Sequence, residues 1–220
     1  MTPVITAIPL GFVNAYLIKT DTGFVLIDTG MGLRRAALEK ALAGAGCGPG
    51  DLRLIVVTHA DADHTGNCAY LREKYGAQVA LHPNEAAMAA GGNMLASRRP
   101  EQTVLTRLLM RLLSLVFALK PSDRFRADVI LTGGENLSSW GLDAKVLHLP
   151  GHSTGSIGVL TAAGDLFCGD LINNYGKPQL HIVDDWATAR ASLEKLKGCD
   201  IKTVYPGHGK PFAMEALAGS

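Results

Sequence analysis

Residues Thr58–Asn67 constrain the fold more than any other stretch, because they gather polar side chains directly after an apolar run. Leu54–Val57 is continuously apolar and mostly β-branched, which predicts a buried strand. Cys68–Tyr75 predicts a helix. The polar residues therefore lie between the carboxyl end of a strand and the amino end of a helix. Open α/β sheets bind ligands at this place, and helix N–H groups there favour negative charge.

Four residues of metal-ligating types lie within six positions of this stretch: His59, Asp61, Asp63 and His64. One Asp at a helix N-cap is ordinary, but two imidazoles interleaved with two carboxylates exceed what capping requires. Alternate side chains of an extended chain point the same way, so His59 and Asp61 can converge on one point. Asp63 and His64, at the bend, can aim at a neighbouring point. Taken alone, the stretch is also compatible with a capped helix that carries two incidental histidines.

Three turns in the second half of the chain repeat this pattern at the ends of predicted strands. Each turn places a histidine or an aspartate beside glycine, which permits tight turns and close backbone approach. One such histidine alone is more often a structural residue. Together with the stretch at 59–64, however, three such turns argue against an incidental origin. The turns are Pro150-Gly151-His152-Ser153, Gly169-Asp170 and Pro206-Gly207-His208-Gly209.

Length and composition predict one globular domain. The chain has 220 residues, of which 47% are hydrophobic, and this is enough for a large core. The formal net charge of +1 gives no electrostatic reason to expect a nucleic-acid partner. The N-terminal residues lack a basic region followed by an apolar core, and the four cysteines show no paired spacing. We therefore expect reduced thiols and a cytoplasmic protein.

The apolar periodicity predicts two strand-rich halves, each of which carries helices. Such halves favour two sheets packed face to face with helices outside. No linker divides them, so residues 1–220 are expected to form a single domain. The predicted strands span 4–8, 13–18, 24–27, 54–57, 78–82, 129–131, 145–149, 156–160, 165–168 and 203–205, and the predicted helices span 33–45, 68–75 and 186–197.

Residues 83–127 interrupt this alternation and are expected to form a helical insertion. Within it, residues 104–120 predict a strongly apolar helix, too short in its uncharged part to span a membrane. One interpretation is a helix that covers the core and exposes its arginines. The other is a lid or a homodimer interface, whose Arg107 and Arg111 face an anionic substrate or a membrane surface.

The motifs described above resemble those of the metallo-β-lactamase superfamily over nearly the whole chain. The family's metal motif is usually His-x-His-x-Asp-His, followed by a distant His, a bridging Asp and a last His. Here the first part is His59-Ala60-Asp61-Ala62-Asp63-His64, and the turns at His152, Asp170 and His208 follow in the same order. Asp28-Thr29-Gly30 is similar to the family's strand-end loop beside the site. The resemblance implies a four-layer αββα sandwich of two mixed β-sheets with helices on the outside.

The resemblance also implies a binuclear metal site. Asp61 stands where the commonest form of the motif has a histidine, which adds an anionic oxygen donor. We therefore expect one or two Zn²⁺ ions, with Mn²⁺ or Fe²⁺ as alternatives that suit an oxygen-rich site. The implied first position is held by His59, Asp61 and His152, the second by Asp63, His64 and His208, and Asp170 bridges the two.

The activity implied by the resemblance is that of a metal-dependent hydrolase acting on a small molecule. A metal-bound hydroxide would cleave a small ester, lactone, thioester or phosphodiester. Asp63 would orient the nucleophile and carry a proton to the leaving group. Two alternatives stay open: a di-iron redox enzyme of the same fold, motivated by Asp61, and a metal-stabilised binding protein that acts through the basic helix at 98–126.

Further residues are expected around the site. Tyr175, Asn173 and His181 lie in the loop after Asp170 and are candidates for substrate contact. A tyrosine hydroxyl placed there can stabilise an oxyanion.

Three more polar residues have expected places. Asp28 is a candidate acceptor for a metal-binding imidazole. His148 is expected to be structural, with support of the site as the alternative, and His82 is expected on the polar surface.

Overall fold

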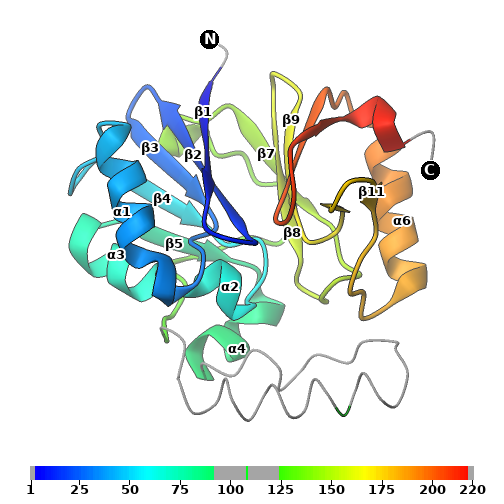
Figure 1. Cartoon of the computed structure of the whole chain (residues 1–220), viewed down its shortest axis with the longest axis horizontal. Coiled ribbons are helices and arrows are strands. Elements are labelled where there is room, and N and C mark those ends of the chain that lie inside the picture. The colour runs from blue at the N-terminus through cyan, green and yellow to red at the C-terminus, as the bar shows by residue number, and fades with distance from the viewer. Residues whose placement is uncertain (1–2, 92–107, 109–123, 218–220) are drawn as a thin grey trace.

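Two β-sheets pack face to face, with helices on their outer faces (Figure 1). This computed structural model describes residues 3–91, 108 and 124–217. In Figure 1, α1 (Arg35–Gly44) and α3 (Cys68–Tyr75) flank the N-terminal sheet, and α6 (Trp186–Lys197) flanks the other one. The layers therefore follow the order helix, sheet, sheet, helix, which confirms the predicted αββα sandwich.

The first sheet is mixed. Its initial three strands pair antiparallel, and the strands that follow pair parallel to β3 and to one another. The parallel strands end at one edge of the sheet, where the polar stretch after residue 57 begins. In spatial order the described strands are β1 (Val4–Pro9), β2 (Asn14–Thr20), β3 (Gly23–Ile27), β4 (Leu52–Val56), β5 (Gln78–Leu81) and β6 (Val129–Ile130).

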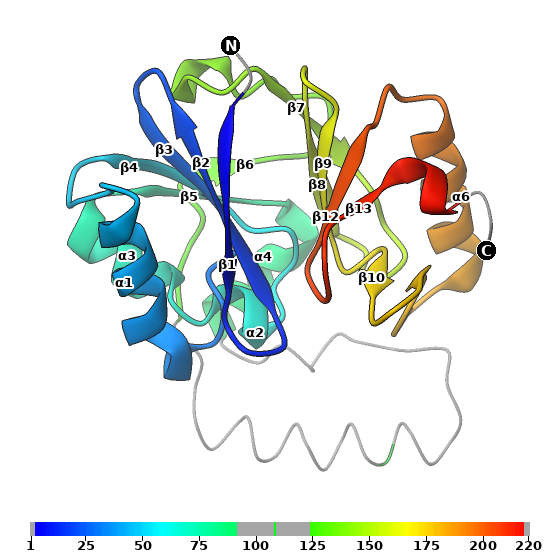
Figure 2. The same cartoon turned by 45° about the horizontal axis from the view of Figure 1, so that its top comes forward.

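The second sheet is also mixed, and its central pair β9 and β12 is parallel. Both strands of that pair end at the same edge, just before Asp170 and His208 (Figure 2). In spatial order the described strands are β13 (Phe212–Ala213), β12 (Thr203–Pro206), β9 (Asp165–Gly169), β8 (Ile157–Thr161) and β7 (Ala144–His148), and a separate ribbon joins β10 (Asn173–Asn174) to β11 (Pro178–Gln179).

Three apolar layers hold the sheets and helices together. Leu38 and Leu42 of α1 pack with one face of the first sheet. The opposite face of that sheet packs against the second sheet around Phe167, which is completely buried. Leu196 of α6 packs with the outer face of the second sheet. Alternate residues of each strand thus enter different layers, because successive strand side chains point to opposite faces.

Local signals in the sequence explain where the longer helices begin and end. Gly76 adopts a positive φ of 71° directly after α3, as a C-terminal glycine cap requires. The Asp185 carboxylate accepts a hydrogen bond from the Thr188 N–H and caps α6. The predictions for 68–75 and 186–197 match α3 and α6 at both ends. The predicted helix 33–45 divides into a short 3-10 turn and α1.

Part of the predicted insertion can be compared with the structure. Residues 83–91 form the 3-10 turn Pro83–Glu85 and α4 (Ala86–Gly91). Apart from Leu108, the helix predicted at 104–120 lies outside the described residues. The insertion's limits, a homodimer through that helix and the binding role of 98–126 therefore stay predictions, as does the cytoplasmic location. Among the described residues, no helix is long and apolar enough to cross a membrane.

Candidate metal centre

The stretch after β4 changes from extended backbone to helix within a few residues. Asp61 keeps an extended conformation and precedes the short helix α2 (Ala62–Thr65). His59 and His64 are almost completely buried. Because the chain turns between them, Asp61 stays near His59 and Asp63 comes close to His64, as the spacing predicts.

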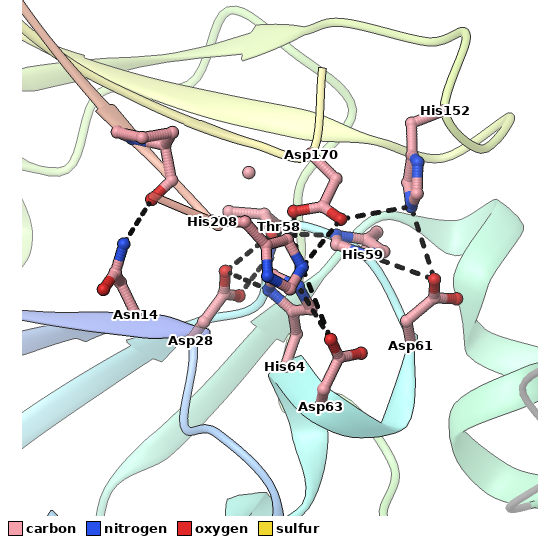
Figure 3. A network of polar contacts seen from close by, with 12 residues as sticks. Asn14, Asp28, Thr58, His59, Asp61, Asp63, His64, His152, Asp170 and His208 are labelled. Carbon is pink, nitrogen blue, oxygen red and sulfur yellow. Dashed lines mark hydrogen bonds and ion pairs between the residues drawn. The ribbon is translucent and has the colours of Figure 1, made fainter. Parts of the chain in front are cut away.

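Seven side chains from both sheets converge at the shared edge (Figure 3). Their ligating atoms form three overlapping groups, and within each group these atoms lie within 4.8 Å of one another. The first group matches the implied first metal position, and the second matches the implied second position. The groups are His59, Asp61 and His152; Asp63, His64 and His208; and His59, His64 and Asp170. We call these seven residues the ligand cluster.

Asp170 lies between the two halves of the ligand cluster. Its Oδ2 is 3.1 Å from His208 Nε2 and 3.9 Å from His152 Nε2, and its Oδ1 is 3.4 Å from His64 Nε2. The carboxylate therefore reaches imidazoles of both implied positions. This placement is what a bridging ligand requires.

The outer nitrogen of three of these imidazoles donates a hydrogen bond to an oxygen outside the ligand cluster. His152 Nδ1 donates to the Ile182 carbonyl and His208 Nδ1 to the Phe12 carbonyl, both at 2.7 Å. His64 Nδ1 donates to the Asp28 carboxylate at 2.8 Å. Carbonyl oxygens only accept hydrogen bonds, so in the neutral rings the proton is on Nδ1 and the Nε2 lone pair faces inward.

His59 completes the same pattern through a hydroxyl group. The Thr58 Oγ1 donates to Asp28 Oδ2 at 2.8 Å, and it lies 3.0 Å from His59 Nδ1. Because its proton is used on Asp28, this hydroxyl accepts from His59. The His59 Nε2 lone pair is therefore also directed into the ligand cluster.

The inner atoms fit a divalent cation. Among the described residues, His59 Nε2, His64 Nε2 and Asp170 Oδ1 are buried and make no hydrogen bond. Buried polar atoms normally have partners, because leaving them unsatisfied costs free energy. Imidazole nitrogen and carboxylate oxygen are the donors that bind Zn²⁺, Mn²⁺ or Fe²⁺. A cation among these atoms would satisfy them together.

Carboxylates dominate the electrostatics of the ligand cluster. Burial by itself lowers the pKa of His64, but Asp170, Asp28 and Asp63 outweigh it and hold this pKa well above its usual value. Burial by itself raises the pKa of Asp170, but the imidazoles of His64 and His208 hold it well below its usual range. The same negative field attracts a divalent cation, whose binding would displace the imidazole proton.

Asp28 orients two groups next to the ligand cluster, as the sequence predicts. It is almost completely buried, and besides His64 it accepts a hydrogen bond from the Thr58 N–H at 2.8 Å. Its backbone has a positive φ of 57°, a conformation that Asp tolerates better than most residues. The turn after β3 therefore aims this carboxylate across the ends of the neighbouring strands.

The predicted substrate-contact residues have different environments. The Tyr175 ring lies 5.9 Å from the His208 ring and 5.6 Å from the His181 ring, and it is 55% exposed. Burial, followed by the charges of Asp170 and Asp63, raises the pKa of the Tyr175 hydroxyl, which therefore keeps its proton at neutral pH.

Asn173 is almost completely buried. Its side-chain amide makes no hydrogen bond within the described part of the chain. Nothing in its contacts assigns this amide to the substrate, so that role stays a prediction.

Sequence reasoning missed two neighbours of the ligand cluster and misplaced one histidine. Phe12 and Ile182 act through main-chain carbonyls, for which the sequence carries no signal. His82 is buried, not on the surface, because its ring stacks on that of His148 at 4.5 Å. His148 Nε2 donates a hydrogen bond to the Thr154 carbonyl, which agrees with the expected structural role of His148.

Comparisons with known proteins agree with this fold. The family model described as Metallo-beta-lactamase superfamily matches residues 8–208. The acyl-coenzyme A thioesterase MBLAC2 of Gallus gallus is 29% identical over an alignment that covers 93% of this chain and 75% of that protein.

Two solved structures extend the likeness to three dimensions. The metallo-beta-lactamase family protein TTHA1429 of Thermus thermophilus is 25% identical, with a TM-score of 0.75 over 98% of this chain and 76% of its own. The protein TTHA1623, solved in a di-iron-bound form, is 28% identical, with a TM-score of 0.68 over 99% of this chain and 97% of its own. With a family match that spans most of its length, the chain belongs to the metallo-β-lactamase superfamily and is a hydrolase of that fold.

Proposed function

We propose that this chain is a two-metal hydrolase that cleaves a small ester or thioester, with lactones and phosphodiesters as further candidate substrates. The observation that carries the proposal is the convergence of the ligand cluster from the strand ends of both sheets. The name of the relative MBLAC2, an acyl-coenzyme A thioesterase, favours the thioester.

Each of the two positions would be held by three side chains, with Asp170 shared. His59, Asp61 and His152 would hold one ion, and Asp63, His64 and His208 would hold the other. When bound, such ions supply an activated water at neutral pH and polarise the substrate's carbonyl or phosphoryl group.

The chain's own residues would orient the substrate and move the proton. Asp63 Oδ2 lies 3.4 Å from His208 Nε2, and the Asp63 side chain is 18% exposed. It can therefore accept a proton from the attacking water and give it to the leaving group. The protonated hydroxyl of Tyr175 would donate a hydrogen bond to the developing oxyanion.

Two exposed rings favour a substrate with an apolar acyl group. The Phe12 ring stacks against His208 with a centroid separation of 5.7 Å, and Tyr175 contacts the same histidine. Phe12 is 58% exposed. Burying such rings under an acyl chain contributes roughly 25 cal/mol for each Å² of apolar surface removed from water.

The identity of the metal depends on Asp61. Its carboxylate adds an oxygen donor and a negative charge to the first position. Compared with a position whose ligands are all histidines, this position binds Fe²⁺ or Mn²⁺ more favourably. The di-iron form of TTHA1623 supports iron as an alternative to zinc.

Elemental analysis of protein purified without added metal, followed by a substrate panel, tests the proposal. The panel holds an acyl thioester, a carboxylic ester, a lactone and a phosphodiester. We expect about two divalent ions per chain and turnover of the thioester or ester. Asp170→Asn should lower both metal content and turnover, the latter by at least about a hundredfold. Asp200→Asn is the control, because the Asp200 main chain lies beside Gly164, just before β9 begins, whereas the ligand cluster lies beyond the other end of that strand. Full turnover by Asp170→Asn would overturn the proposal.

A di-iron redox enzyme is the second candidate, favoured by Asp61 and by the di-iron form of TTHA1623. A visible absorption band that bleaches on reduction, without hydrolysis of any panel substrate, would support it. Colourless protein that contains zinc and hydrolyses an ester would dismiss it.

A further inference from the structure

Glu85 is a buried carboxylate next to the ligand cluster that the proposed reaction does not use. It ends the 3-10 turn Pro83–Glu85 after β5 and is completely buried. Its Oε2 accepts a hydrogen bond from the Ala60 N–H at 3.0 Å. Its Oε1 accepts from the Ser153 hydroxyl at 2.7 Å and from the Gly155 N–H at 3.0 Å. These bonds offset the high cost of burying a charge.

The three donors belong to two different loops. Ala60 lies between His59 and Asp61 on the loop after β4. Ser153 follows His152 on the loop between β7 and β8. One side chain therefore joins the first sheet to the second at the residues that form the first metal position.

The packing of the second loop fits this carboxylate closely. A Cβ atom on Gly155 would lie 2.6 Å from Glu85 Cγ, so the loop can approach only because residue 155 is glycine. Ser156 Oγ lies 2.8 Å from Ser153 Oγ and accepts a hydrogen bond from the Ser153 N–H. The hydroxyl that Glu85 binds is thus itself held in place.

The second metal position is oriented by other groups. His64 bonds Asp28, and His208 bonds the Phe12 carbonyl. None of the hydrogen bonds of Glu85 described above involves either histidine or its acceptor. A change at Glu85 should therefore act on one position and leave the other nearly unchanged.

We propose that Glu85 is a positioning residue for the first metal position, whose affinity it sets without contacting the ion. It fixes the separation of the loops that carry His59, Asp61 and His152, and its negative charge adds to the attraction for a cation. The inference rests on the proposed two-metal function.

The test is a metal titration of the metal-free protein with Zn²⁺ or Co²⁺, with a competing chelator as reference. Glu85→Gln keeps the shape of the side chain but turns an NH₂ group toward one of the present donors. We expect the affinity for one of the two ions to fall about 10- to 100-fold, and the other to stay within about threefold. Glu39→Gln is the matched control, because Glu39 also joins two elements, through Lys74 and Tyr70, but does so in the outer helix layer.

Two backgrounds assign the effect to a position. His208→Ala weakens binding at the second position, so the ion that this variant still binds reports on the first position. In this background Glu85→Gln should cause the full loss of affinity, about 10- to 100-fold. His152→Ala weakens the first position and leaves the second one intact. In this background Glu85→Gln should have almost no effect on metal affinity. In Co²⁺-loaded protein, Glu85→Gln should change the visible absorption in the first background alone.

Several outcomes would overturn the inference. An equal loss of affinity for both ions would show that Glu85 is a general structural residue. Unchanged affinity for both ions would show that Glu85 does not position the metal ligands. If Glu85→Gln does not fold, Ser153→Ala can replace it. This variant removes one of the three hydrogen bonds to Glu85 and should still lower the metal affinity of the first position severalfold. If the wild-type protein binds no metal, the proposed function itself is wrong. If the wild type and the Glu85 variant both bind two ions with equal affinity, only the inference about Glu85 is wrong.

Discussion

Asp28 Oδ2 accepts a hydrogen bond from His64 Nδ1 at 2.8 Å, across the ends of two parallel strands. This contact fixes the ring so that its other nitrogen faces the ligand cluster. We therefore expect Asp28→Asn to lower metal affinity about 10- to 100-fold. Asn tolerates the positive φ of residue 28, so backbone strain will not account for the loss. Competition with a chelator measures it.

The control for this prediction is Asp21→Asn, in the exposed turn between β2 and β3. It should bind metal like the wild type. Unchanged affinity in Asp28→Asn would show that the Asp28 carboxylate has no part in orienting His64.

A second prediction concerns Gly209, which follows His208. Residue 209 has a φ of +89°, and a Cβ there would lie 1.8 Å from the Asn174 carbonyl oxygen. Gly176 has a similar φ of +112°, but a Cβ there meets nothing within 4 Å. Both alanine variants carry backbone strain of about 1–2 kcal/mol. We expect Gly209→Ala to lose about 1–3 kcal/mol more in the free energy of unfolding, because it also clashes.

Urea unfolding of the two variants measures this difference. Equal losses would mean that the backbone at Gly209 moves away from Asn174 at no cost. In that case the carbonyl of Gly209, which accepts from Asn14 Nδ2 at 2.7 Å, should also be free to shift.

The third prediction concerns Ile182, a β-branched residue with a positive φ of 49°. Its carbonyl accepts the hydrogen bond from His152, so the conformation serves the ligand cluster. Strain of this kind costs about 1–3 kcal/mol. Ile182→Gly relieves the strain but adds about 0.5–1 kcal/mol of chain entropy and loses side-chain contacts. We expect the free energy of unfolding to change by less than about 1 kcal/mol.

The neighbouring Val183 is the comparison, because it is buried in the layer under α6. Val183→Gly should cost at least about 2 kcal/mol. If calorimetry showed Ile182→Gly to be as destabilising, the strain assigned to residue 182 would be wrong.

The fourth prediction concerns stability in acid. Burial by itself raises the pKa of Glu135, but hydrogen bonds from the Thr132 N–H and hydroxyl and the Gly133 N–H lower it to about 2. The unfolded chain has the higher, ordinary value of about 4.5, so this carboxylate stabilises the fold above pH 4.5. That contribution disappears as the pH falls to about 2.

Glu135→Gln should therefore be less stable than the wild type at pH 7, and the difference should shrink between pH 4.5 and 2. Denaturant unfolding at several pH values measures both curves. A constant difference across this range would contradict the assignment.

Local patterns in the sequence predicted two strand-rich halves and polar residues at the strand ends, whereas the αββα order and the full set of seven ligands were implied by the family resemblance. Apolar strands such as β4 end directly before clustered polar residues, and glycine marks the turns at His152 and His208. The helix α6 shows its apolar period and its cap at Asp185 within one short stretch.

The parts that escaped prediction depend on contacts made only after folding. β10, β11 and β13 each contain two residues, too few for any periodicity. The role of Glu85 is set by three donors that lie between 25 and 70 positions away along the chain. His82 is buried because it stacks on His148 of the other sheet, and its own surroundings in the sequence give no sign of this.

The ligand cluster draws on loops of both sheets, and its members follow one another along the chain from His59 to His208. On the ribosome, four of them emerge long before the fifth. A complete set exists only once β12 has joined β9 and brought His208 to the others. A newly made chain would therefore bind its ions tightly only after its two sheets have docked, so that tight metal binding reports the completion of folding.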